Sequence, residues 1–295
     1  MIRALIRSFN AAPATAAACA ALLLADQALA QPAPAPTGAN ANRTVNLNYV
    51  YAAQLGFGGY SLAGLSADVY TLPLADTLQN LPYEGWALKL LLPVQAGIYS
   101  FRATDVGGQR IAIDQQSVSV VPGAELQIPI GERIVMKPFA QVGEAHAFGT
   151  GAGNADSWIF LAGVRALTQW QAGDYTISLG NAVVYAGDQT IGPGFAEHYV
   201  SLQLGAEVRR PLGFQVGDIA PDIGVYVADY YYPAPLQFSR FLKPTLRVAN
   251  QNEIGLSIGS ATPFQMLWLA NPRIGVGFVF GGGLNVWHVN FGFQF

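Results

Sequence analysis

The amino-acid sequence predicts an all-β fold, a closed antiparallel transmembrane β-barrel of about twelve strands. Three observations support this prediction. The chain of 295 residues is 52% hydrophobic but only 11% charged, whereas soluble domains carry about 25% charged residues. Beyond residue 30 it has no apolar run of the ~18 residues that a transmembrane helix needs. Its last segment alternates between aromatic and small or polar side chains, which is the period of a strand.

The last segment of the printed sequence carries the clearest strand signal. Trp287 and the aromatic residues Phe291, Phe293 and Phe295 fall in one register, and His288 falls in the other. In water such an edge would promote aggregation, whereas in a membrane the aromatic face meets lipid and the polar face meets a lumen. We therefore expect the three phenylalanines to face outward and to form the signal that barrel-assembly machinery recognises.

The N-terminal region predicts export. Arg3 and Arg7 form a basic start, the apolar stretch 11–25 follows, and Ala28-Leu29-Ala30 is a small-residue cleavage site. We predict a signal peptide over residues 1–30, an uncleaved anchor being the alternative. Residues 31–43 form a flexible Pro/Ala-rich spacer, and residues 44–295 form an outer-membrane β-barrel. These features place the protein in the cell outer membrane of a Gram-negative bacterium.

Alternation along the barrel region predicts the individual strands and their connections. We expect short periplasmic turns at 131–132 and 171–174, and longer external loops at 146–156, 187–197 and 231–244. The connections 75–85 and 211–221 are long for periplasmic turns. The predicted strands are 44–54, 60–73, 86–92, 116–130, 133–146, 157–169, 174–186, 199–209, 222–231, 245–258, 273–280 and 285–295.

Energetics assigns the inner face of each strand. A Lys or Arg facing lipid at the midplane costs about 2–4 kcal/mol, so the charged register should point into the lumen. Asn250 and Asn252 then face outward, which indicates either a bulge or a position above the bilayer. The predicted lumen-facing residues are Asp68, Lys89, Glu125, Lys137, Arg165, Glu207, Arg209, Arg247, Glu253 and His288.

Aromatic residues close to predicted strand ends point to the headgroup layer, where amphipathic rings gather. The alternative for the tyrosines at 230–232 is a ligand-binding cluster. The residues concerned are Trp158, Tyr199, Tyr230, Tyr231, Tyr232 and Trp287.

Three stretches carry a resemblance to a known family. They are VYTLPLADTLQNLPYEGWALKLLLPVQAG, VVPGAELQIPIGERIVMKPFAQVGEA and PRIGVGFVFGGGLNVWHVNFGFQF. Together they resemble the solitary outer-membrane autotransporter-like β-barrel family, and the resemblance spans nearly the whole exported chain. It implies a twelve-stranded barrel like an autotransporter translocator, but standing alone. With only the spacer 31–43 before the first expected strand, we expect no passenger domain and no helix in the lumen.

Catalysis and metal binding have little support in the sequence. An outer-membrane lipase needs a histidine and a serine on one strand face, and the least implausible pair, His198 and Ser201, is three residues apart and thus on opposite faces. Glu144 and His146 share a face but make a weak metal site. We expect no enzyme activity, no catalytic residue, no metal and no cofactor. The net charge of −3 gives no basic patch for nucleic acid.

Three functions remain open on these observations. The first is a non-enzymatic, porin-like narrow passive pore with a mixed-charge lumen, favoured by lumen glycines such as Gly255, Gly275 and Gly277, which leave space. The second is a closed structural or adhesin-like barrel with functional external loops, favoured if the lumen charges pair. The third is a phospholipase or deacylase. Expected partners are outer-membrane lipid, lipopolysaccharide and the assembly machinery, and the sequence does not predict the solute or the oligomeric state.

Overall fold

The structure is a computed structural model. The chain divides into two units, residues 1–39 and 40–295, and all the residues that the structure describes belong to the second. The predicted signal peptide, spacer and first strand 44–54 lie outside them. The described residues are 57–62, 65–78, 81–105, 110–150, 155–192, 196–238, 242–243, 246–262, 265–266, 269–270, 273–282, 284–291 and 295.

The described part of the chain contains strands and turns, and none of its residues forms a helix that could span a membrane. The strands are β1 (Phe57–Leu62), β2 (Leu65–Leu78), β3 (Ala87–Asp105), β4 (Arg110–Val120), β5 (Gly123–Ile130), β6 (Ile134–Thr150), β7 (Ala155–Ala172), β8 (Tyr175–Thr190), β9 (Ala196–Pro211), β10 (Pro221–Phe238), β11 (Leu242–Lys243), β12 (Leu246–Ser260), β13 (Gln265–Met266), β14 (Leu269–Ala270), β15 (Ile274–Gly281) and β16 (Leu284–Asn290).

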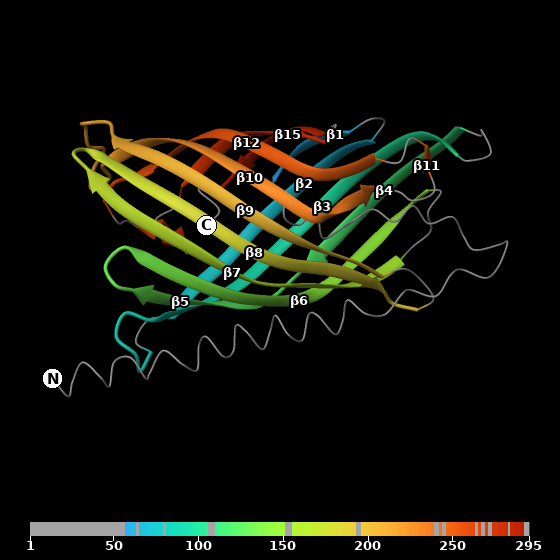
Figure 1. The fold of residues 1–295 in the computed structure, drawn as a ribbon. Coiled ribbons are helices and arrows are strands. Elements are labelled where there is room, and N and C mark those ends of the chain that lie inside the picture. Colours follow the sequence, from blue (N-terminus) through green and yellow to red (C-terminus); the bar gives the residue numbers. More distant parts are fainter. Residues whose placement is uncertain are drawn as a thin grey trace. The chain divides into compact units, whose positions relative to one another are not determined.

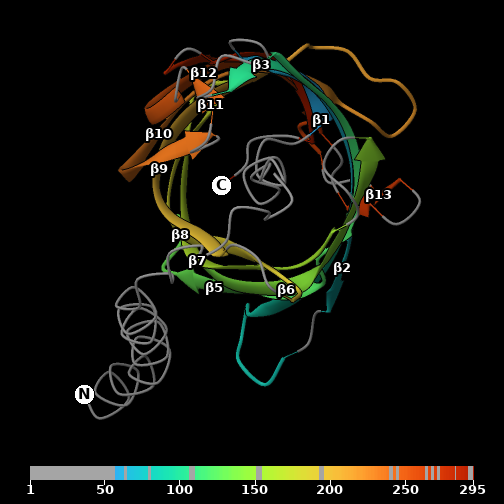
Figure 2. The same ribbon diagram turned by 90° about the vertical axis from the view of Figure 1, so that its right-hand side faces the viewer.

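Antiparallel pairing joins the long strands into a closed ring, whereas β13 and β14 pair only with each other (Figures 1 and 2). Each long strand pairs with its neighbours in sequence, and β1 pairs with β16 from Phe57↔Val289 to Leu62↔Leu284. Strands β4 and β5 share one wall position, because both pair with β3 and with β6 and are separated only by Val121 and Pro122. The wall therefore has twelve strand positions among the described residues, which confirms the predicted barrel and strand number.

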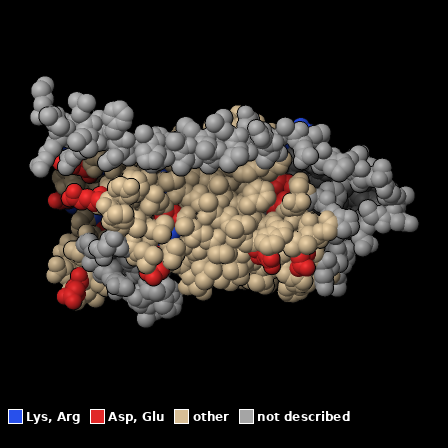
Figure 3. All heavy atoms as spheres, turned by 90° about the horizontal axis from the view of Figure 1, so that it is seen from below, with Lys and Arg blue, Asp and Glu red and all other residues tan. Residues whose placement is uncertain are grey.

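The two faces of the wall differ as the alternation predicts. In β9, Ser201, Gln203 and Glu207 are buried on the lumen side, whereas Leu202 and Leu204 are exposed on the outside. Similar apolar side chains cover the outside of the other long strands, among them Leu92, Val142, Leu179, Val227, Leu256 and Val276. Figure 3 shows mainly uncharged groups over the described surface, with acidic groups gathered toward the ends. This surface matches lipid, because burying charge there is costly.

Several expected boundaries differ from the structure. The predicted strand 60–73 is the β1–β2 hairpin, so the strand count is reached without the segment 44–54. The expected external loops 146–156, 187–197 and 231–244 lie largely in strands, because β6 to β10 run past the apolar band and continue their pairing there. These extensions are rich in polar residues, and in the sequence such a composition resembles that of a loop.

The aromatic residues divide between the two faces. Trp158, Tyr231 and Trp287 are exposed on the outside, in agreement with the expected interfacial positions. Tyr199 and Tyr232 are 3% exposed and lie inside the ring, where their rings meet edge-on at 5.8 Å. Tyr230 also lies on the lumen side, where it lines a cavity. The prediction for these three tyrosines is wrong, because their strands place them in the lumen register. Tyr199 and Tyr232 belong to an apolar cluster that also includes Ile159, Val184 and Val248.

Candidate functional site

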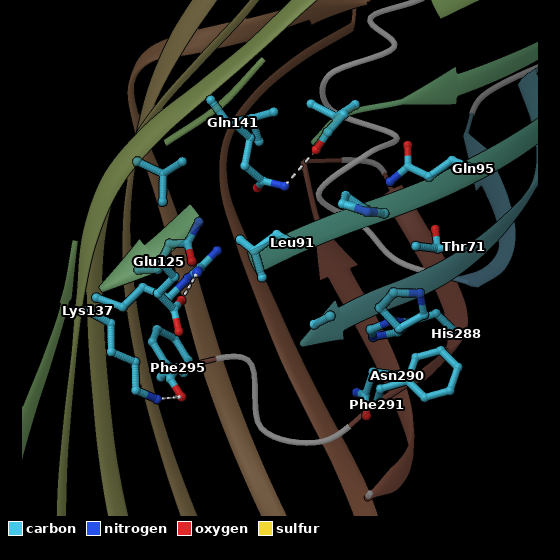
Figure 4. Close-up of a pocket in the computed structure, with 18 of the residues that line it drawn as sticks. Thr71, Leu91, Gln95, Glu125, Lys137, Gln141, His288, Asn290, Phe291 and Phe295 are labelled. Atoms are coloured by element: carbon cyan, nitrogen blue, oxygen red, sulfur yellow. Dashed lines mark hydrogen bonds and ion pairs between the residues drawn. The ribbon is translucent and has the colours of Figure 1, made fainter. Parts of the chain in front are cut away.

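The lumen contains a cavity of about 400 Å³ (Figure 4). We call it the lumen cavity. Side chains from strands on all sides of the ring contribute to its wall, and most of its polar lining comes from residues that are charged or carry amides. These polar residues are Thr71, Lys89, Gln95, Glu125, Gln127, Lys137, Gln141, Arg165, Gln203, Gln251, Glu253, His288 and Asn290.

Glu253 is the centre of one hydrogen-bonded group on this wall. It is 3% exposed and lies on β12. The hydroxyls of Tyr226 and Tyr230, both on β10, donate to its two carboxylate oxygens at 2.6 and 2.7 Å. His288 Nε2 on β16 lies 2.8 Å from Glu253 Oε1. Asn290 donates in turn to the Tyr226 hydroxyl. A buried carboxylate needs such donors, since an unpaired charge away from water is unfavourable.

A second group joins β5, β6 and β7. Arg165 Nη1 lies 2.8 Å from Glu125 Oε2, and its guanidinium carbon stands 3.9 Å from the centre of the Phe139 ring. Lys137 is the cross-strand neighbour of Arg165, and its Nζ donates to the main-chain oxygen of Phe295 at 3.0 Å. Lys89 is the cross-strand neighbour of Glu125. Three cationic side chains, the carboxylate of Glu125 and a main-chain oxygen of Phe295 therefore meet at this side of the cavity.

A third group surrounds Glu207, which is 2% exposed. Ser257 donates to its Oε1 at 2.7 Å, and the Nε atoms of Arg209 and Arg273 lie 3.5 and 3.6 Å from its oxygens. Arg273 also pairs with Asp222 through two contacts. The lumen charges of this group are thus largely neutralised by one another.

Eight of the ten residues predicted to face the lumen lie on the inner face, distributed over these three groups. Asp68 and Arg247 do not, and for them the prediction is wrong. Asp68 pairs with the outward-facing Ile98 and is exposed. Arg247 is exposed because β12 changes phase at Ala249 and Asn250, where the register with β10 also shifts. This irregularity is the bulge that the outward asparagines indicated.

Phe295 also departs from its predicted place. We expected it on the lipid face, but its ring lies in the lumen at 6% exposure and rests on Gly180, where a Cβ would collide with it. β16 ends at Asn290, so the alternation no longer applies beyond it. Phe291, at 49% exposure, borders the lumen cavity, and Phe293 lies outside the described residues.

The sequence prediction missed the tyrosine donors and Arg273. A signal for Tyr226 was available, because Ile223, Val225 and Val227 mark the outer register of β10 and leave the even positions inside. Arg273 opens the predicted strand 273–280 in the register of Gly275 and Gly277, so the alternation offered a signal for it as well. Its contacts with Asp222 and Glu207 show that it lies on the lumen side.

The histidines do not assemble a hydrolytic site within the described residues. His198 is exposed on the outside beside Tyr185, whereas Ser201 is buried on the lumen side and accepts a hydrogen bond from Gln203 at 2.9 Å. His146 pairs with Asp156 at 2.5 Å on the outer surface. No group of three or more potential metal-ligating side chains occurs among the described residues.

Comparison with known proteins gives a match at the level of structure. No family model matches the sequence, and no curated protein matches it. The translocator domain of the autotransporter NalP from Neisseria meningitidis superimposes with a TM-score of 0.56 and 11% identity, covering 78% of this chain and 82% of that one. The β domain of the Bordetella autotransporter BrkA gives 0.55 and 12%, covering 79% and 92%. The fold is that of an autotransporter-like outer-membrane β-barrel, as the resemblance implied.

Proposed function

We propose that this autotransporter-like barrel is a non-enzymatic protein of the Gram-negative outer membrane whose lumen is closed at rest. It contacts outer-membrane lipid and lipopolysaccharide with its apolar outer face, and barrel-assembly machinery inserts it. In this proposal it acts through binding at its lumen or outer end, and bulk solute does not cross it.

The observation that carries the closed lumen is the filling of its glycine positions. In the sequence these glycines leave space, but a Cβ at Gly255 would collide with Tyr226, and one at Gly275 with Asn290. At Gly277 the side chains of Glu253, His288 and Tyr226 occupy the space. Tyr226 and Asn290 are the direct cross-strand neighbours of Gly255 and Gly275, so the glycines leave room for these side chains to lie over the inner face of the wall. Glu253 beside them is hydrogen-bonded.

A narrow pore is the second candidate. The lumen cavity favours it, because a polar space of about 400 Å³ with Lys89, Lys137, Arg165, Glu125 and Glu253 in its wall could pass small ions if its ends open. Mixed charge of this kind would set the selectivity.

Planar-bilayer recording separates these two functions. We expect no discrete conductance steps from purified protein whose folding is verified by its heat-modifiable mobility on a gel. Discrete steps from the folded protein would overturn the closed lumen and favour the pore.

A fatty-acid release assay tests the non-enzymatic part. We expect release from phospholipid vesicles no greater than that caused by heat-unfolded protein. Release that disappears in His198→Ala or Ser201→Ala would contradict it.

A further inference from the structure

We propose that the lumen cavity is a binding site for a small aromatic carboxylate, and that Phe295 occupies part of this site in the absence of such a ligand. The site has three parts. A cationic side contains Lys89, Lys137 and Arg165, a surface over Gly180 holds the Phe295 ring and is called the seat, and a facing wall contains Gln251, His288 and Asn290.

The cationic side carries three cationic side chains and one acidic side chain, Glu125. Arg165 is paired with Glu125 at 2.8 Å. Lys137 donates to a main-chain oxygen of Phe295, and Lys89 has no hydrogen-bond or ion-pair partner among the described residues. All of these side chains line the cavity. An ammonium group that is partly removed from water gains from an anionic partner, so this side is complementary to a carboxylate.

Phe295 shows what the seat accepts. Its ring covers Gly180, where the absence of a Cβ leaves a flat surface on β8, and its main-chain oxygen receives the Lys137 hydrogen bond at 3.0 Å. Phe295 thus places an aromatic ring on Gly180 and an oxygen acceptor at Lys137. An aromatic carboxylate would place the same two groups on the same two residues. Figure 4 shows Lys137 and Phe295 together at one side of the cavity.

The facing wall provides an independent indication of a ligand. Gln251 Nε2, His288 Nδ1 and Asn290 Oδ1 have no hydrogen-bond partner among the described residues. The three side chains are 0, 3 and 4% exposed and line the cavity. In Figure 4, His288 and Asn290 lie on the side away from Lys137. Asn290 Oδ1 is directed at Gly275. Gln251 Nε2 and His288 Nδ1 remain buried without partners, which is unfavourable, so a polar ligand or water is expected beside them.

The cavity also has a suitable size. Its volume of about 400 Å³ falls in the range of about 300–1,000 Å³ typical of small-molecule sites. A single ring with a short carboxylate chain fits this volume, and a larger solute would have to displace more than Phe295.

Isothermal titration calorimetry of the purified full-length barrel in detergent tests the site, with 3-phenylpropionate as the probe. The uncharged 3-phenylpropan-1-ol is its comparison, and titration into protein-free micelles corrects for partitioning. We expect the carboxylate to bind about tenfold or more tightly than the alcohol, since the ion pair with Lys137 is missing in the alcohol. Equal binding of both probes would overturn the proposal.

Variants locate the site. Lys137→Met should weaken binding about tenfold or more, and Lys137→Arg, which retains the charge, should restore it. Phe295→Ala should tighten binding about tenfold, because it removes the ring that occupies the surface over Gly180 at high effective concentration. Arg247→Met, on the outer surface, should leave binding unchanged.

Two outcomes contradict the site even if Lys137→Met fails to fold. One is the absence of binding to folded Phe295→Ala at millimolar probe, and the other is equal affinity of Phe295→Ala and the unmodified protein. These measurements require no membrane potential, so their failure is distinguishable from failure of the closed-lumen proposal in bilayers.

Discussion

Replacement of Glu253 by alanine tests whether the lumen is filled and dry. Glu253 accepts hydrogen bonds from Tyr226 and Tyr230 and lies 2.8 Å from His288 Nε2. The substitution leaves all three groups without their acceptor. It also leaves a space beside Gly277, which Glu253 and His288 together cover.

The size of the effect depends on water. A buried donor that stays unpaired costs about 1–3 kcal/mol, so three dry donors cost about 3–9 kcal/mol. Glu253 is only 3% exposed but lines the lumen cavity, and donors that turn toward water there recover part of this loss. We therefore expect the free energy of unfolding to fall by about 3 kcal/mol, the lower end of that range.

Urea unfolding of the barrel in detergent micelles, followed by tryptophan fluorescence and by gel mobility, measures this change. Glu132→Ala is the matched control, because Glu132 lies exposed in the turn between β5 and β6. Glu253→Gln should fall between the two, since its amide oxygen still accepts hydrogen bonds. A loss for Glu253→Ala of no more than that for Glu132→Ala would refute the reasoning and show that water solvates the lumen.

Three further predictions concern other parts of the barrel. Gly255→Leu should lower the free energy of unfolding by about 1–3 kcal/mol, because the new side chain collides with Tyr226; an unchanged urea midpoint would contradict the packing of that ring over Gly255. Glu125→Leu alone should destabilise by more than Glu125→Leu combined with Arg165→Met, because a single change leaves a charge unpaired; additivity in this double-mutant cycle would show that the pair at 2.8 Å is not coupled. Leu204→Arg, at 62% exposure on the outer face, should cost about 2–4 kcal/mol in lipid vesicles, with Glu132→Arg as control; equal stability of the two variants would place Leu204 outside the apolar band.

Much of the fold was predictable from the sequence because strand periodicity is a local property. The alternation in β9 assigned Leu202 and Glu207 to opposite faces, and the structure has them so. Low charge and the absence of a long apolar run predicted a barrel instead of helices. The same periodicity could not locate the β1–β2 hairpin inside the segment 60–73, because the alternation of side chains does not mark where one strand ends and the next begins.

The lumen groups were harder to predict. Inward direction was correct for Lys89, Glu125 and Glu253, but their partners depend on the register between strands distant in sequence. Glu253 receives a donor from Tyr226 and approaches His288, and neither contact leaves a mark in the spacing of residues. The change of phase in β12 that turns Arg247 outward depends on its pairing with β10.

The sequence by itself determined that this chain forms a membrane barrel with an apolar exterior and a polar interior. The period of two is a local property of each strand, and the low charge content is a property of the composition. Only the tertiary structure decided what fills the interior. Tyr226 crosses over Gly255, and Phe295 turns from its expected lipid face to rest on Gly180 beside Lys137. Closure of the ring brings β8, β10 and β16 around one lumen, and contacts across that space follow from closure, which no local pattern encodes.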